Sequence, residues 1–196
     1  MTTASKPVVY MIVIRDNPIS MYFRGRVERS WIDRGFDVEY FDAITPETIP
    51  EQKHQLTFGE KVGRRRRREF SETEKAVWYS HRALWDISRR KQSPIIVAEH
   101  DALLLRPIDT VIFKNVKIMG LCHSLLDNGT MGTTAGGAYY LTRDVAKEMY
   151  EETRNKTIRY NSDNLIHAKI DQHGEWRTHY CEQIREDSIG TTIRHG

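Results

Sequence analysis

Alternating apolar and polar stretches along the chain predict an α/β domain. The apolar run at residues 8–14 predicts a strand buried on both faces. Apolar positions then recur at helical spacing over residues 19–34, and Gly35 is a typical helix stop. Residues 36–41 alternate between apolar and polar side chains, which is typical of a half-exposed strand. A strand, a helix and a second strand in this order predict a mainly parallel central sheet flanked by helices.

The strongest strand signal lies in the middle of the chain. Residues 95–98 are apolar and rich in β-branched side chains, and they lead directly into Glu99, His100 and Asp101. Because side chains alternate along a strand, Glu99 and Asp101 are expected on one side and His100 on the other. Residues 103–105 are three leucines that return the chain to the core. The acidic residues therefore stand between two buried segments.

This acidic position has two interpretations. Open α/β sheets bind their ligands at the carboxyl ends of their strands, so Glu99 and Asp101 could hold one Mg²⁺ or Mn²⁺ ion, and such ions often hold substrate phosphates as well. Acidic residues also follow strands simply because loops are solvated. The buried segments on either side favour the metal site, since unpartnered carboxylates would be costly there.

A capping box predicts the second long helix. Ser71 and Glu74 have the spacing for reciprocal capping, and residues 72–90 carry an inward face that includes Ser80 and His81. His81 is either an ordinary packed histidine or a hydrogen-bonding group for a phosphate or the acidic loop.

Two further segments of the chain carry candidate chemistry. The small residues 132–138 allow a close backbone approach, and Thr142 is expected to cap the helix that follows them. Asp163 opens another short helix, predicted to end near Lys169, and it is either a helix cap or a carboxylate that faces the open edge of the sheet.

Residues 46–70 lose the apolar periodicity and are predicted to form a mobile basic loop. The segment includes Gly59, Gly63 and five consecutive arginines, Arg64, Arg65, Arg66, Arg67 and Arg68. The arginines are either a solvated charged face or a clamp on an anion, such as a sugar-nucleotide pyrophosphate, an anionic glycan or nucleic-acid phosphates.

Composition supports a single globular domain over residues 1–196. The net charge of +3 is local, because without the five consecutive arginines 25 basic and 27 acidic residues remain. Two cysteines are too few for a disulfide scaffold, and no signal peptide or membrane-spanning run is evident. We therefore expect a soluble protein of a reducing compartment, the cytoplasm.

Taken together, the motifs of almost the whole chain resemble the family 25 glycosyltransferases of lipopolysaccharide biosynthesis. The resemblance is carried by Arg15-Asp16, Phe41-Asp42-Ala43-Ile44, Glu74 with Ser80-His81 and Trp85, residues 96–101, residues 137–142 with Ala146, and Asp163. His100 stands where the family has an acid, and the arginine run is atypical. The compact chain resembles bacteriophage-encoded relatives.

The resemblance implies a single GT-A domain, Rossmann-like, that uses Mn²⁺ or Mg²⁺ to hold the diphosphate of a nucleotide sugar such as a UDP-sugar. It implies that Asp101 and Glu99 bind the metal, with His195 preferred to His179 as third ligand. Asp101 would thereby stabilise the leaving diphosphate, and Asp163 would face the acceptor hydroxyl as a base. The donor would be bordered by Ile14, Arg15, Asp42, Ala43, Ser80, His81, Glu99 and His100.

The acceptor expected from the resemblance is a glycan or a modified DNA base, with the basic loop as a contact. Two other classes of protein stay open. A nucleic-acid-binding module would explain the arginine run, although the rest of the chain is slightly acidic. A catalytically silent glycosyltransferase-like protein would explain the histidine within the acidic motif.

Overall fold

The computed structural model describes residues 6–49, 56–62, 67–125 and 131–184. The predicted metal ligand His195 and the arginines Arg64 to Arg66 lie outside these residues.

One mixed sheet forms the centre of the α/β domain. Its path runs β2-β1-β5-β9-β7-β10-β6, and β8 pairs with β7. Neighbours are parallel in the β2-β1-β5 part and between β7 and β10, whereas β9 is antiparallel to both β5 and β7. The strands are β1 (Val8–Val13), β2 (Val38–Asp42), β5 (Ile95–Glu99), β6 (Ala102–Leu104), β7 (Ile118–Leu125), β8 (Met131–Thr133), β9 (Ala138–Leu141) and β10 (Glu175–Gln183).

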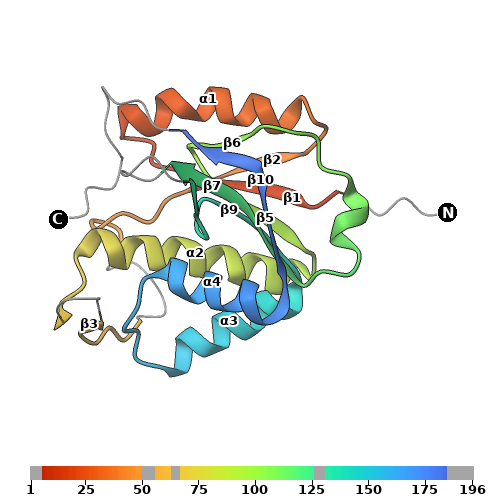
Figure 1. Cartoon of the computed structure of the whole chain (residues 1–196). Coiled ribbons are helices and arrows are strands. Elements are labelled where there is room, and N and C mark those ends of the chain that lie inside the picture. The colour runs from red at the N-terminus through yellow and green to blue at the C-terminus, as the bar shows by residue number, and fades with distance from the viewer. Residues whose placement is uncertain (1–5, 50–55, 63–66, 126–130, 185–196) are drawn as a thin grey trace.

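Helices cover both faces of the sheet. Figure 1 shows α1 on one side and the helices α2, α3 and α4 on the other. The helices are α1 (Pro18–Ile32), α2 (Glu72–Lys91), α3 (Arg143–Asn155) and α4 (Ser162–His173), with a short 3₁₀ helix, η2 (Thr110–Phe113). The predicted α/β class is confirmed, and the three strands β2, β1 and β5 are parallel as expected.

The alternation of side chains on β1 and β5 produces the two core layers. Tyr10, Ile12 and Val97 pack on the side of α2, whereas Met11 and Ile96 pack on the side of α1. The same alternation continues past the apolar residues of β5. It therefore determines the face of the sheet toward which each following polar side chain points.

Glu74 ties the described part of the basic segment to α2. The predicted capping box is present: Ser71 Oγ accepts a hydrogen bond from Glu74 N, and Glu74 Oε2 accepts one from Ser71 N at 3.0 Å. Glu74 also receives two hydrogen bonds from Arg68 at 2.7 and 2.8 Å and an ion pair from Lys61. Arg68 is therefore occupied in a structural contact.

Other parts of residues 46–70 are structured as well. Ile49, Leu56 and Phe70 are buried in the core. Two short strands, β3 (Lys61–Val62) and β4 (Arg67–Arg68), pair in antiparallel orientation. The described residues of this segment therefore contribute to the core, and its polar character concealed single large apolar side chains.

Two helix predictions need correction in detail. Helix α4 continues to His173, one turn beyond the predicted end near Lys169. Thr142 is the N-cap of α3, but its hydroxyl makes no capping hydrogen bond.

Strand β10 was missing from the sequence-based prediction, since its residues follow no clean apolar alternation.

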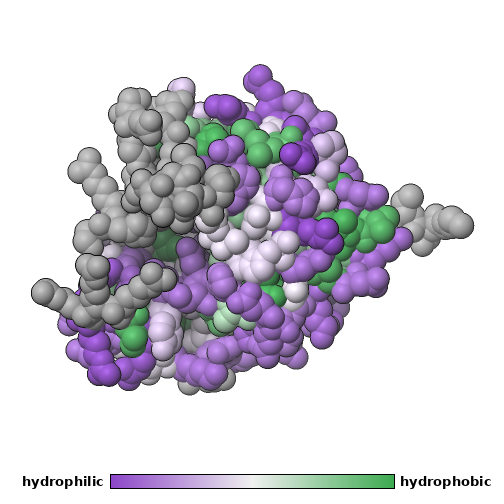
Figure 2. Space-filling view, viewed as in Figure 1, coloured by the Kyte–Doolittle hydropathy of each residue, from purple (hydrophilic) through white to green (hydrophobic). Residues whose placement is uncertain are grey.

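The visible surface is mainly hydrophilic. Figure 2 shows purple residues over most of the described part of this face, with hydrophobic residues in separate smaller groups. Among the described residues, no helix has the length and apolarity needed to cross a bilayer.

The contacts of Glu74 predict a change in acid stability. Burial alone would raise the pKa of Glu74, but hydrogen bonds from Arg68 and Lys61 lower it to about 2. A carboxylate with a lowered pKa contributes stability above its unfolded pKa and loses it as the pH falls toward 2. We expect Glu74→Gln to lower the free energy of unfolding at pH 7 by about 1–3 kcal/mol, measured by urea denaturation.

The control is Glu72→Gln in the same turn of α2, where the side chain is 60 % exposed and forms an ion pair with Lys75. This variant should unfold with nearly wild-type stability. Equal stability of the two variants at pH 7 would contradict a structural role for Glu74.

Candidate functional site

A cavity of about 250 Å³ opens at the carboxyl ends of β1, β2 and β5, beside α2. Most of its wall is apolar, and polar groups gather at the end of β5. This is the position at which open α/β sheets bind ligands. The lining residues are Ile12, Ile14, Ala43, Ile44, Thr45, Pro46, Glu47, Thr73, Ala76, Val77, Ser80, His81, Glu99 and His100.

Backbone hydrogen bonds hold the segments that form the apolar wall. Ile14 N donates to Ser20 Oγ in the first turn of α1, and Ala43 N donates to the carbonyl oxygen of Val13. Ile44 N donates to Ser80 Oγ at 2.9 Å, which fixes the segment after β2 against α2. The Ser80 hydroxyl is therefore a structural group of the wall as well as a cavity-lining one.

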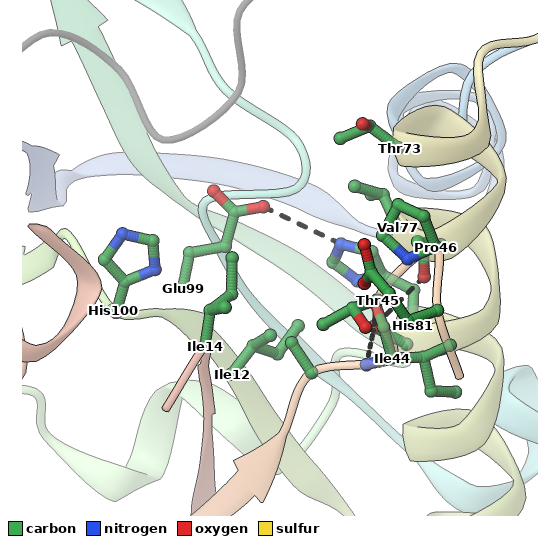
Figure 3. Close-up of a pocket in the computed structure, with 14 residues that line it drawn as sticks. Ile12, Ile14, Ile44, Thr45, Pro46, Thr73, Val77, His81, Glu99 and His100 are labelled. Carbon is green, nitrogen blue, oxygen red and sulfur yellow. Dashed lines mark hydrogen bonds and ion pairs between the residues drawn. The ribbon is translucent and has the colours of Figure 1, made fainter. Parts of the chain in front are cut away.

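Glu99 is the carboxylate of the cavity wall. Its backbone N donates to Gly137 O at 2.8 Å, so β5 is still paired at this residue. Figure 3 shows Glu99 between His100 and His81, with one carboxylate oxygen directed to His81. The side chain is 20 % exposed, and burial raises its pKa to about 7. The carboxyl group therefore gains or loses its proton near neutral pH.

His81 and His100 present buried nitrogens without hydrogen-bond partners among the described residues. His81 Nε2 lies 3.8 Å from Glu99 Oε1, too far for a hydrogen bond, and His100 Nε2 likewise has no partner in the described part of the chain. Burial lowers the pKa of both rings to about 4, although Asp163 acts in the opposite direction on His81 and an Ile12 backbone hydrogen bond does so on His100. Both imidazoles are neutral at pH 7.

Asp101 and Glu99 converge on one amide group. Gln183 Nε2, from β10, donates to Glu99 Oε2 at 3.1 Å and to Asp101 Oδ2 at 3.2 Å. The predicted alternation is therefore present, because the two carboxylates reach the same point. His100 is not part of this set and instead contacts the Ile12 backbone.

The two carboxylates fit a divalent cation of the Mg²⁺ or Mn²⁺ type. Their oxygens face a common point, and such ions take one or two protein carboxylates together with water and substrate phosphates. Within the described ranges, no group of three or more His, Cys, Asp or Glu side chains is placed to hold a metal ion.

Asp163 approaches the same region from α4. A Cβ atom on Gly136 would lie only 2.5 Å from Asp163 Oδ1, so the carboxylate packs directly on the Gly136 backbone. The charge of Asp163 also acts on both His81 and Tyr139. The small-residue segment before β9 thus allows a helix carboxylate to approach the end of β5.

The predicted site residues divide into three groups. Six of the predicted donor-binding residues line the cavity, whereas Arg15 and Asp42 form an exposed ion pair with each other. Asp101 and Asp163 are not among the lining residues, and each contacts a neighbour of the cavity wall instead. Their roles stay predictions. The lining members are Ile14, Ala43, Ser80, His81, Glu99 and His100.

Sequence reasoning missed Gln183 and the pairing of Tyr139 with His81. Gln183 lies 84 residues from Glu99, on a strand that was not predicted. Tyr139 O–H lies 3.0 Å from His81 Nδ1, yet in the sequence Tyr139 is only one aromatic residue of an apolar strand. The four residues of β9 are all apolar or aromatic and all buried, so their pattern carried no signal for the face on which Tyr139 lies.

Comparison with known proteins found one family model that matches part of the chain. Residues 23–117, just under half of the chain, match the sequence model of glycosyltransferase family 25 (LPS biosynthesis protein). No curated protein matches this chain. One similar solved structure is the "crystal structure of a glycosyltransferase involved in the glycosylation of the major capsid of PBCV-1", with 9 % identity, a TM-score of 0.45, and coverage of 89 % of this chain and 82 % of that chain.

Burial of Glu99 predicts a characteristic pH dependence. A carboxyl group whose folded pKa is raised to about 7 binds more protons when folded, so its contribution to stability falls as the pH rises from its unfolded value toward 7. Glu99→Gln should remove this loss. We expect the variant to gain stability relative to the wild type between pH 5 and pH 8, measured by thermal unfolding without added cation. A constant difference across this range would show that Glu99 titrates normally.

The convergence of two carboxylates on Gln183 predicts how a third carboxylate at position 183 would change cation binding. Gln183→Glu should tighten Mn²⁺ binding by about tenfold, because a further anionic oxygen is added at the same point, measured by calorimetry. Without cation, the three carboxylates should repel one another and lower the melting temperature. Gln172→Glu, an exposed change of equal charge on α4, is the control and should leave Mn²⁺ affinity unchanged.

Proposed function

We propose that the chain is a transferase of the glycosyltransferase family 25 type, because residues 23–117 match the sequence model of that family. In this proposal it moves a sugar from a nucleotide-sugar donor to an acceptor hydroxyl with the help of a divalent cation. The donor we favour is a UDP-sugar, and the cation is Mn²⁺ or Mg²⁺. The observation that carries this proposal is the meeting of an apolar cavity with two convergent carboxylates, Glu99 and Asp101, at the carboxyl end of β5.

The cavity wall combines two kinds of side chain. Ile14, Ile44 and Val77 are apolar and suit the flat face of a nucleobase. Glu99 and His81 add polar groups, toward which the diphosphate of the same donor would be directed. A nucleotide diphosphate combines these two requirements in one molecule.

Sugar transfer breaks the bond between the anomeric carbon and the diphosphate oxygen and forms a bond from that carbon to the acceptor oxygen. The diphosphate leaves with additional negative charge, which a bound divalent cation would stabilise electrostatically. Glu99 and Asp101 would hold that cation, and Gln183 keeps their oxygens at one point. Preorganisation of this kind lowers the cost of reorganising charged groups during the reaction.

The acceptor hydroxyl must also lose a proton. We assign Asp163 as the base that receives it if the reaction inverts the anomeric configuration, because its carboxylate reaches the end of β5 from α4. The acceptor class that we propose is a glycan hydroxyl, in keeping with the lipopolysaccharide family of the matching segment. A modified DNA base has less support, since Arg67 and Arg68 are engaged with Glu60 and Glu74.

A thermal-shift experiment tests the core of the proposal. UDP and Mn²⁺ together should raise the melting temperature of the wild type more than the sum of their separate effects, because each binds better in the presence of the other. Asp101→Asn should remove the cooperative part and leave the melting temperature without ligands within a few degrees of wild type. Asp144→Asn is the control, because this exposed carboxylate on α3 does not line the cavity.

Other outcomes would identify the competing classes. A shift with duplex DNA alone would favour a nucleic-acid-binding module, and UDP binding without any hydrolysis of a panel of nucleotide sugars would favour a silent binding protein. Slow Mn²⁺-dependent release of UDP from one sugar nucleotide would support the transferase and identify its donor. An Asp101→Asn protein with wild-type cooperativity would refute the metal site.

A further inference from the structure

A chain of hydrogen bonds reaches the cavity from the interior of the protein. Trp85 Nε1 donates to the hydroxyl of Tyr139 at 2.9 Å, and this hydroxyl lies 3.0 Å from His81 Nδ1. All three side chains have no more than about 1 % exposure. His81 and Trp85 are four residues apart on α2, so both face Tyr139 on β9. Burial raises the pKa of Tyr139, so its hydroxyl keeps its proton.

The directions of the hydrogen bonds between Trp85, Tyr139 and His81 determine the tautomer of His81. The Tyr139 hydroxyl already accepts from Trp85, so its own proton can be donated to His81 Nδ1. A neutral imidazole that accepts at Nδ1 carries its proton on Nε2. The opposite tautomer would leave the Tyr139 proton without an acceptor among the described residues and would place the bare Nε2 lone pair 3.8 Å from Glu99 Oε1.

Among the described residues, the Nε2 proton then has no acceptor. His81 Nε2 is buried, has no hydrogen-bond partner in the described part of the chain, and belongs to a ring that lines the cavity. An unsatisfied buried donor costs about 1–3 kcal/mol, and such groups in native proteins usually have a reason. The geometry points to a missing acceptor inside the cavity.

We propose that Tyr139 and Trp85 are positioning residues that hold His81 in the Nε2–H tautomer, so that His81 binds an oxygen atom of the nucleotide-sugar donor as a neutral hydrogen-bond donor. This inference rests on the proposed function for the identity of the ligand, but the tautomer itself does not. The proposal gives His81 a ligand-binding role. Packing alone does not explain why this ring directs a polar atom into the cavity.

The hydrogen-bond geometry of His81 defines this role. With Tyr139 on Nδ1, the Nε2–H group is the donor that the ring presents to the cavity, and Glu99 and Asp163 are the nearby acidic groups. An N–H donor binds an oxygen by direction and distance. The ring therefore discriminates by geometry, and a hydrogen-bond-accepting oxygen at the right position is required of the ligand.

Nuclear magnetic resonance of ring nitrogens tests the inference directly. The chain has eight histidines, and the His81 signals are assigned by their loss in His81→Gln. We expect the two-bond ¹H–¹⁵N pattern of the Nε2–H tautomer in the wild type, and a shift of the His81 Nε2 signal when UDP and Mn²⁺ are added. An Nδ1–H tautomer in the wild type would overturn the inference, whether or not UDP binds.

Amide replacements provide matched variants for binding. His81→Gln keeps a donor near the Nε2 position, and His81→Asn keeps one near Nδ1. We expect the Kd for UDP in the presence of Mn²⁺ to rise less than about threefold for His81→Gln and about tenfold or more for His81→Asn. Equal weakening in both variants would contradict a donated Nε2 proton.

Tyr139→Phe tests the positioning role. Removal of the hydroxyl should populate the Nδ1–H tautomer of His81 and weaken UDP binding by about five- to tenfold. An unchanged tautomer in a folded Tyr139→Phe protein would overturn the role of Tyr139. If this variant does not fold, the wild-type spectrum and the two His81 variants still decide the inference. Failure of UDP to bind the wild type would overturn the nucleotide-sugar proposal instead, and the spectrum without ligand would separate the two results.

Discussion

The site depends on the point at which strand β5 stops being apolar. Ile95 to Ala98 are fully buried between α1 on one face and α2 on the other, and Glu99 continues the backbone pairing without continuing the apolar sequence. A carboxylate is thereby held at the end of a rigid strand, where it is only partly hydrated. Its raised pKa, its contact with Gln183 and its position beside His81 all follow from this one constraint.

Neighbouring elements satisfy that carboxylate only in part. Gln183 contributes an amide donor to Glu99 and Asp101, whereas His81 stops just beyond hydrogen-bond distance. Incompletely paired polar groups at the edge of an otherwise well-packed core are typical of binding sites, since a fully satisfied network would leave nothing for a ligand to bind. The apolar layers on both sides of the sheet supply the stability that such a site requires.

Much of this arrangement was predictable from local sequence patterns. The buried strand, the capping box at Ser71 and Glu74, and the common direction of Glu99 and Asp101 follow from periodicities that act over a few residues. Gln183 was not predictable in this way, because its position depends on β10 pairing between β7 and β6. Arg68 shows the same limit, since an arginine run appears solvated until the fold brings Glu74 beside it.

The placement of β10 has a consequence for how the protein is made. Residues 175–183 pair in parallel with β7 and antiparallel with β6, so the central sheet has a gap until this late segment has been synthesised. Parallel pairing between distant segments forms slowly, and β6 has no other partner on the path of the sheet. A nascent chain on the ribosome would therefore expose the flanks of β6 and β7, and it would acquire an organised carboxylate pair only after residues 175–183 have been synthesised.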